Sequence, residues 1–184
     1  MINKKEFRSI RKELESHEKN REKLIQASRE MIKLSKEVIH ALHRDDLKLA
    51  KSAMANMDKA FKSFPKRPWE TNMGHMAMQE YVEAAAYFYL MTKKRLPTRK
   101  ELKVDNAAYL TGLCDLTGEL VRKAYKCVIQ GNLDEAKKLA KFVDDLYYEF
   151  LQLKLRGDLR KKGDAIKYNL AKLEDVVYNI SLRK

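Results

Sequence analysis

The stretch MQEYVEAAAYFYLM, from Met78 to Met91, decides the fold class of this chain. It holds no Gly or Pro and is apolar on every side of a helix, apart from two acids at Glu80 and Glu83. A helix that is hydrophobic all round has to be covered by other helices. The stretch therefore predicts a largely buried helix within an all-α protein.

The rest of the chain predicts further helices around this one. Only six glycines and three prolines occur among 184 residues, and Lys, Leu, Ala, Glu and Met, which favour helices, dominate. Apolar residues at steps of three and four from Leu24 to Leu42 indicate one long amphipathic helix. We expect one domain, residues 1–184, formed by an antiparallel bundle of about seven helices. The main segments are expected at about 4–43, 46–64, 69–94, 105–130, 131–155 and 156–184.

Two pairs of acids stand out because the helices that carry them are otherwise almost uncharged. At ~100° per residue, Glu80 and Glu83 lie within ~60° of each other on their helix. The stretch NAAYLTGLCDLTGELV (106–121) carries only Asp115 and Glu119, which also share one face. Unpaired carboxylates are costly to bury, so both pairs need a cation. A cluster of oxygen ligands suits Mg²⁺, or alternatively Mn²⁺, better than zinc.

A structural ion pair is the alternative explanation for these acids. Arg122 follows Glu119 by one helical turn, and a Lys or Arg from another helix would satisfy Glu80 or Glu83. A di-iron site is not predicted, because the two acid-bearing helices carry none of the Glu-x-x-His pairs that such bundles use. The histidines of the first helix are interpreted as surface or packing residues: His17, His40 and His43.

The charge of the chain favours an anionic partner. Lys and Arg number 39 against 26 acids, a formal net charge of +13, and nucleic acid is the common partner of such a surface. Basic residues next to aromatic ones suit single-stranded nucleic acid, because phosphates meet cations and bases stack. A merely solvated basic surface is the alternative. The predicted nucleic-acid-binding residues are Arg160, Lys161, Lys162, Lys66 and Arg67.

Membrane contact is not expected. No apolar run approaches the length of a membrane span, and the N-terminal residues contain no signal-peptide core. Cys114 and Cys127 lie in one predicted helix and cannot bridge each other, which indicates reduced thiols. We therefore expect a cytoplasmic protein.

Several separate blocks are similar to a known family. LRKKGDAIKYNLAKLEDVVYNISLR (159–183), REKLIQASREMIKLSKEVIHALHR (21–44) and GLCDLTGELVRKAYKCVIQGNLDEA (112–136) resemble the C-terminal, N-terminal and central segments of the translin family. QEYVEA (79–84) and DLTGEL (115–120) resemble its catalytic branch, translin-associated factor X.

This resemblance implies an all-α, translin-like subunit of a hollow octameric shell that binds single-stranded RNA on its inner wall. It also implies Mg²⁺-dependent endoribonuclease activity, with Glu80, Glu83 and Asp115 as the catalytic acids and metal ligands and Glu119 as a further ligand. We expect a homo-octamer that cleaves single-stranded RNA, and single-stranded DNA is a further candidate partner. The alternative is a non-catalytic, translin-like oligomer that binds single-stranded RNA or DNA.

Overall fold

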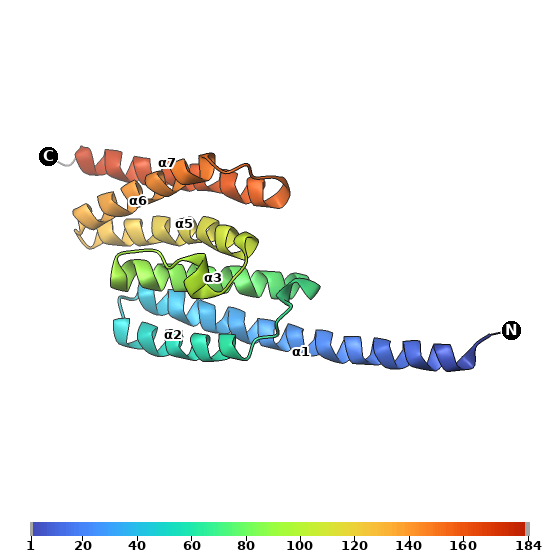
Figure 1. Ribbon diagram of the computed structural model, residues 1–184. Coiled ribbons are helices and arrows are strands. Elements are labelled where there is room, and N and C mark those ends of the chain that lie inside the picture. Colours follow the sequence, from blue (N-terminus) through green and yellow to red (C-terminus); the bar gives the residue numbers. More distant parts are fainter. Residues whose placement is uncertain (1, 183–184) are drawn as a thin grey trace.

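The computed structural model describes residues 2–182, and helices make up most of this part of the chain (Figure 1). No β-strand occurs within these residues. The predicted all-α fold is confirmed, with seven α-helices and one short 3₁₀ turn, η1. The bounds are α1 Lys4–His43, α2 Leu47–Lys62, η1 Pro68–Glu70, α3 Asn72–Lys93, α4 Arg99–Leu102, α5 Asn106–Ile129, α6 Leu133–Leu151 and α7 Gly157–Ser181.

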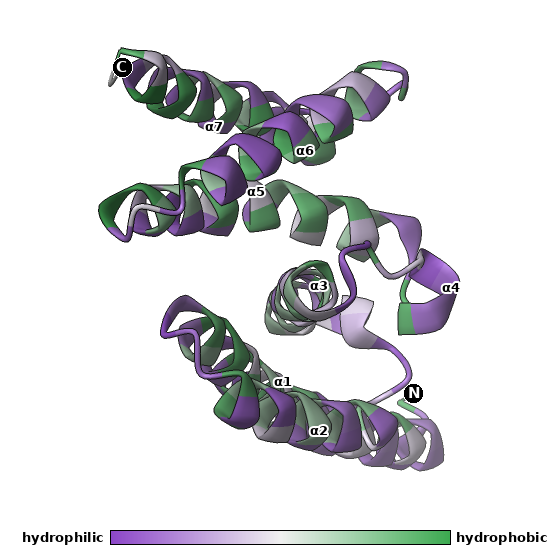
Figure 2. Ribbon diagram, turned by 90° about the vertical axis from the view of Figure 1, so that its left-hand side faces the viewer, coloured by the Kyte–Doolittle hydropathy of each residue, from purple (hydrophilic) through white to green (hydrophobic). Residues whose placement is uncertain are grey.

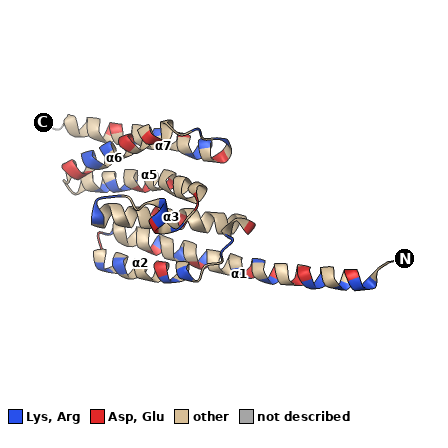
Figure 3. Cartoon of the chain, in the orientation of Figure 1, with Lys and Arg blue, Asp and Glu red and all other residues tan. Residues whose placement is uncertain are grey.

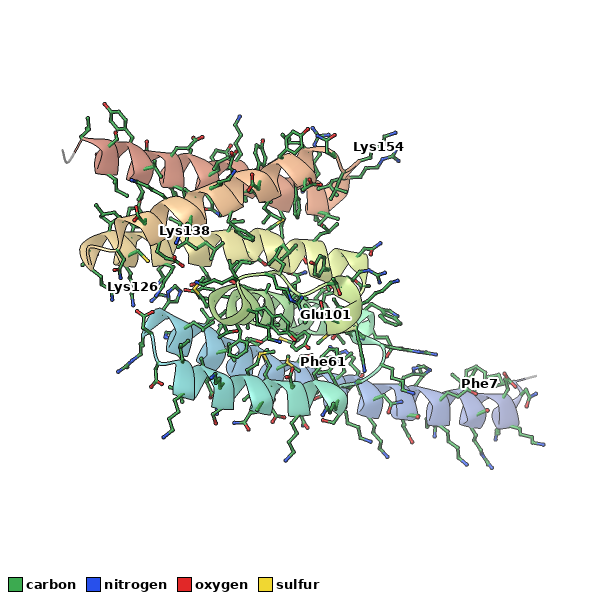
Figure 4. The ribbon with its side chains drawn as sticks, turned by 60° about the vertical axis from the view of Figure 1, so that its left-hand side comes forward. Phe7, Phe61, Glu101, Lys126, Lys138 and Lys154 are labelled. Carbon is green, nitrogen blue, oxygen red and sulfur yellow. The ribbon has the colours of Figure 1, made fainter. Side chains whose placement is uncertain are left out.

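Helix α1 has two halves in different surroundings. It begins where the Asn3 side chain accepts hydrogen bonds from the first free backbone N–H groups, the usual role of an N-cap. Its second half buries the predicted apolar stripe from Leu24 to Leu42. Its first half projects beyond the bundle (Figure 1) and carries acids and bases side by side (Figure 3). Phe7 on this half is exposed (Figure 4).

Helix α3 lies in the middle of the molecule, as its apolar sequence predicts. It packs on α1 on one side and on α5 on the other, and Figure 2 views it nearly along its axis between these layers. The residues from Tyr81 to Tyr87 are all buried. Phe61 of α2 stacks on the ring of Tyr81, with ring centroids 4.3 Å apart. These contacts fix which sides of α3 face apolar neighbours and which side carries its acids.

Several helices that pack on each other run in the same direction. The colours of Figure 1 show α1, α3, α5 and α7 running in the same direction, while α2 and α6 run in the opposite direction. The connector between α3 and α5 carries the chain back, so that α5 starts beside the start of α3. Thr98 and Glu101 form a capping box at the start of α4 within this connector. Adjacent segments such as α1 and α2 are antiparallel, but the packed pair α3 and α5 is parallel.

A close approach of α3 and α5 depends on Gly112. A Cβ atom at this position would lie 2.6 Å from Cβ of Val82 and 2.8 Å from the backbone oxygen of Gln79. Only a residue without a side chain permits this contact between the helices. The approach brings the acid-bearing turns of the two helices next to each other.

Two further findings concern the thiols and the hydropathy of the helices. Cys114 and Cys127 are both buried free thiols on α5. Within residues 2–182, none of the helices combines the length and the apolar character that crossing a bilayer requires. The cytoplasmic location stays a prediction.

Candidate active site

The four acids predicted from the sequence lie together between α3 and α5. Glu83 of α3 is only 8% exposed. Burial raises the pKa of its carboxyl group to about 8, and the negative charges of the other three acids add to this rise. Burial also raises the pKa of Glu80, against the opposing charge of Lys36 on α1. The structure therefore places all four carboxyl groups within electrostatic reach of each other.

Two of these acids have no partner in the described part of the chain. Among residues 2–182, no hydrogen bond or ion pair holds the carboxylate of Glu80 or Glu83. Every fully buried side-chain oxygen or nitrogen in this part has a hydrogen-bond partner. The oxygens of Glu83 therefore keep some contact with solvent, and a small cation has access to them.

His43, the last residue of α1, holds Glu119. Its side chain is 2% exposed, and its Nε2 contacts Oε2 of Glu119. This hydrogen bond lowers the pKa of Glu119, and since an ionised carboxylate only accepts, Nε2–H is the donor. The hydroxyl of Tyr87 lies 3.4 Å from Nδ1, and Lys126, labelled in Figure 4, donates to the His43 carbonyl at 2.7 Å.

The interpretation of His43 as a surface or packing residue missed this contact. His43 follows Ile39 by one turn on a buried face of α1, and this spacing was the signal that it points into the bundle. The ion pair expected from Arg122 is present but longer, with 3.8 Å between its NH1 atom and Oε2 of Glu119.

Lys162 of α7 occupies the other end of the acid site. Its Nζ donates to Oδ2 of Asp115 at 2.5 Å and to Oε1 of Gln79 at 3.1 Å. This is the expected ion pair from another helix, although it is made with Asp115. The side chain of Lys162 is 37% exposed, whereas that of its neighbour Lys161 is 81% exposed. The predicted cluster of three consecutive basic residues is thus divided between the acid site and the solvent.

The donor set suits a divalent cation in type and charge. All four acids supply oxygen ligands, and a positive charge would relieve the buried, crowded carboxyl group of Glu83. Among the described residues, no three His, Cys, Asp or Glu side chains converge closely enough to coordinate one ion. Two of the acids are engaged by other side chains, Asp115 by Lys162 and Glu119 by His43.

The other predicted nucleic-acid-binding residues lie at one end of the bundle. Lys66 and Arg67 precede α3, and Arg160 and Lys161 lie in the first turns of α7; all four are exposed. Because α3 and α7 start at the same end (Figure 1), both basic groups lie there. Lys66 lines a cavity of about 310 Å³ together with Trp69, whose ring is largely exposed. Nucleic-acid binding by these residues stays a prediction.

Comparison with known proteins identifies similar sequences. A model of the translin family matches residues 19–184. Translin of Gallus gallus is 37% identical over 81 residues, which is 44% of this chain and 35% of that protein. The translin-associated protein X homolog of Schizosaccharomyces pombe is 26% identical over 204 residues, covering 97% of this chain and 88% of that protein. The aligned stretch thus spans about a third of the first relative and most of the second.

Solved structures share the whole fold. The crystal structure of apo-NeC3PO superimposes with a TM-score of 0.87 at 32% identity, covering 94% of this chain and 95% of that chain. The structure of an AfC3PO–duplex RNA complex gives a TM-score of 0.83 at 26% identity, covering 97% of this chain and 98% of that chain.

Proposed function

Because this chain belongs to the translin family, we propose that it is a metal-dependent endoribonuclease. One observation carries this proposal: four carboxyl groups from α3 and α5 share one site, and two of them, Glu80 and Glu83, have no partner among residues 2–182. Such a concentration of acids opposes folding unless a cation neutralises it. A pure binding protein has no need of it.

The acids and their neighbours would divide the work of the site. Glu80, Glu83 and Asp115 would hold Mg²⁺, or Mn²⁺ in its place, with Glu119 as a further ligand. A bound divalent ion activates water and stabilises the charge that develops on a phosphate. His43 would keep Glu119 in one orientation, as residues that hydrogen-bond to a metal ligand do in other metal sites.

We propose RNA as the substrate and an octamer of identical chains as the active form. The excess of basic residues, the exposed basic groups at one end of the bundle and the RNA complex of the related AfC3PO support RNA binding. In the stretch Val143–Leu155, Tyr148, Leu151 and Leu153 are exposed, which leaves apolar surface for a neighbouring subunit. In a closed shell, flexible single strands would reach the acids more easily than folded RNA.

A non-catalytic nucleic-acid-binding oligomer is the second candidate function. The ion pair of Lys162 with Asp115 and the hydrogen bond from His43 to Glu119 favour it, since they satisfy two of the four acids without a metal. In that case Asp115 and Glu119 would serve as structural partners of Lys162 and His43 and would bind no metal.

The test compares cleavage of labelled single-stranded and duplex RNA, each with Mg²⁺ and with EDTA. We expect cleavage of the single strand in Mg²⁺ only, and its loss in Glu80→Gln and Asp115→Asn, because each change removes a ligand charge at nearly constant shape. Asp58→Asn is the matched control: Asp58 is a partly buried carboxyl group on α2 whose pKa burial also raises, but it lies outside the site.

Light scattering and RNA binding in EDTA complete the experiment. Both should be unchanged in the two site variants. Normal cleavage by both variants would eliminate the metal site, and loss of folding in both would assign the acids to structural ion pairs. Equal cleavage of duplex and single strand would contradict the proposed shell without affecting the acids.

A further inference from the structure

Lys162 reaches the acid site from a third helix and connects the two that carry the acids. Its ammonium group contacts Oε1 of Gln79 on α3 and Oδ2 of Asp115 on α5. Both contacts are oxygens, and they come from opposite sides of the site. A cation that binds between α3 and α5 would need oxygen atoms from both helices around it. The ammonium group has such oxygens, so it occupies a place suited to a metal ion.

The positive groups near the acids serve different carboxyl groups, and Lys36 of α1 opposes the raised pKa of Glu80 more strongly than Lys162 does. Arg122 approaches Glu119 only to 3.8 Å, and more than half of its side chain is exposed. His43 contributes a hydrogen-bond donor to Glu119. Among residues 2–182, Lys162 alone forms an ion pair with Asp115. Asp115 therefore depends on this lysine for its counter-charge when no other cation is present.

We propose that Lys162 is a built-in counter-ion of the acid site, and that a divalent cation displaces its ammonium group from Asp115. The inference rests on the proposed metal site. An ammonium group on a flexible four-carbon stem is strongly hydrated once it is free, and more than a third of this side chain already faces solvent. The exchange thus needs a side-chain rotation and no movement of α7.

This arrangement makes metal binding competitive. The divalent ion gains Asp115 as a ligand only when Lys162 has moved away. The apparent affinity for the ion is therefore the intrinsic affinity multiplied by the fraction of molecules in which Asp115 is free. Without a metal, the lysine limits the repulsion among the acids. The same residue therefore stabilises the metal-free subunit and weakens its hold on the ion.

The first measurement is Mn²⁺ binding to the intact protein, followed by electron paramagnetic resonance without RNA. We expect Lys162→Met to bind Mn²⁺ roughly 10-fold more tightly, as removal of a unit charge a few ångströms from a divalent ion predicts. Lys161→Met, the matched control for loss of charge on the same helix, should change the affinity less than about 2-fold. Circular dichroism checks that both variants fold.

The second measurement tests displacement in the unaltered chain. A brief pulse of an acetylating reagent, read by mass spectrometry, reports the accessibility of each lysine. Saturating Mn²⁺ should increase the labelling of Lys162 several-fold and leave that of Lys161 unchanged. Because no substitution is involved, this result does not depend on the folding of a variant.

The outcomes separate this inference from the proposed function. If Mn²⁺ binds and the acetylation of Lys162 does not increase, the lysine has stayed on Asp115. The inference is then wrong, while the proposed metal site stands. If Mn²⁺ binds to neither the unaltered protein nor Lys162→Met, both are wrong. Binding to Lys162→Met alone would contradict displacement and the proposed function, because the ammonium group would then keep the metal out of the unaltered protein.

Discussion

Replacement of Gly112 by alanine should separate the two helices that carry the acids. The new Cβ would lie 2.6 Å from Cβ of Val82 and 2.8 Å from the backbone oxygen of Gln79. Neither atom belongs to a flexible side-chain end that rotates away, so α3 and α5 must move apart. The same movement increases the distance between their carboxyl groups.

The size of the effect follows from two opposing contributions. Alanine is favoured over glycine inside a helix by ~1 kcal/mol. Overpacking of a tight contact costs roughly 1–3 kcal/mol, and a collision with backbone and a β-branched residue belongs at the upper end. We therefore expect Gly112→Ala to lower the free energy of unfolding by roughly 2 kcal/mol.

Gly118→Ala is the matched control on the same helix. Its Cβ would meet only the side-chain amide of Asn169, at the ordinary distance of 3.8 Å. We expect it to raise the free energy of unfolding by up to ~1 kcal/mol, the helix-propensity gain alone. Urea unfolding of both variants at one protein concentration, together with Mn²⁺ binding, measures the difference. Equal stabilities, or a Gly112→Ala variant with full Mn²⁺ affinity, would refute the reasoning.

Three further predictions concern charge and assembly. Since the pKa of Glu83 is raised to about 8 in the fold, its carboxyl group must take up a proton on folding above about pH 4.5, and the cost of this uptake in the metal-free protein grows as the pH rises towards 8. Glu83→Gln should therefore stabilise it by roughly 3 kcal/mol at pH 7 and hardly at all at pH 4.5 in urea unfolding with EDTA. Charge reversal of Arg160 and Lys161 should weaken RNA binding and flatten its salt dependence by roughly 1.4 log units per log unit, if each contacts one phosphate; an unchanged slope in a salt titration would move the binding surface towards Lys66 and Arg67. Light scattering should give eight times the 21.6 kDa mass of one chain, and a monomer that cleaves RNA would rule out the shell.

Local sequence patterns predicted the helices and showed that each pair of acids shares one face of its helix. The apolar stripe from Leu24 to Leu42 marked the buried half of α1. Spacing along each helix also placed Glu80 with Glu83, and Asp115 with Glu119. These features depend on residues within a few positions of each other, which the sequence displays directly.

The partners of the acids could not be predicted in this way. His43 and Glu119 are 76 residues apart, and Lys162 and Asp115 are 47 apart. The first pair joins α1 to α5 and the second joins α7 to α5, so both depend on packing between distant segments, which no local pattern encodes. Consecutive basic residues looked like one cluster, but each residue is turned by ~100° from the last, so Lys162 faces the bundle while Lys161 faces solvent.

The late position of Lys162 in the chain has a consequence for biosynthesis. A nascent chain that has emerged as far as the end of α6 already contains all four acids, but not the lysine that pairs with Asp115. In such an intermediate, Asp115 lacks its counter-charge, although Lys36, His43 and Arg122 are already present. Docking of α7 then adds the counter-charge together with the burial of Ile166, Leu170 and Leu173. The last helix to be synthesised therefore consolidates a contact between two earlier ones, and this long-range closure should make folding of the subunit cooperative and comparatively slow.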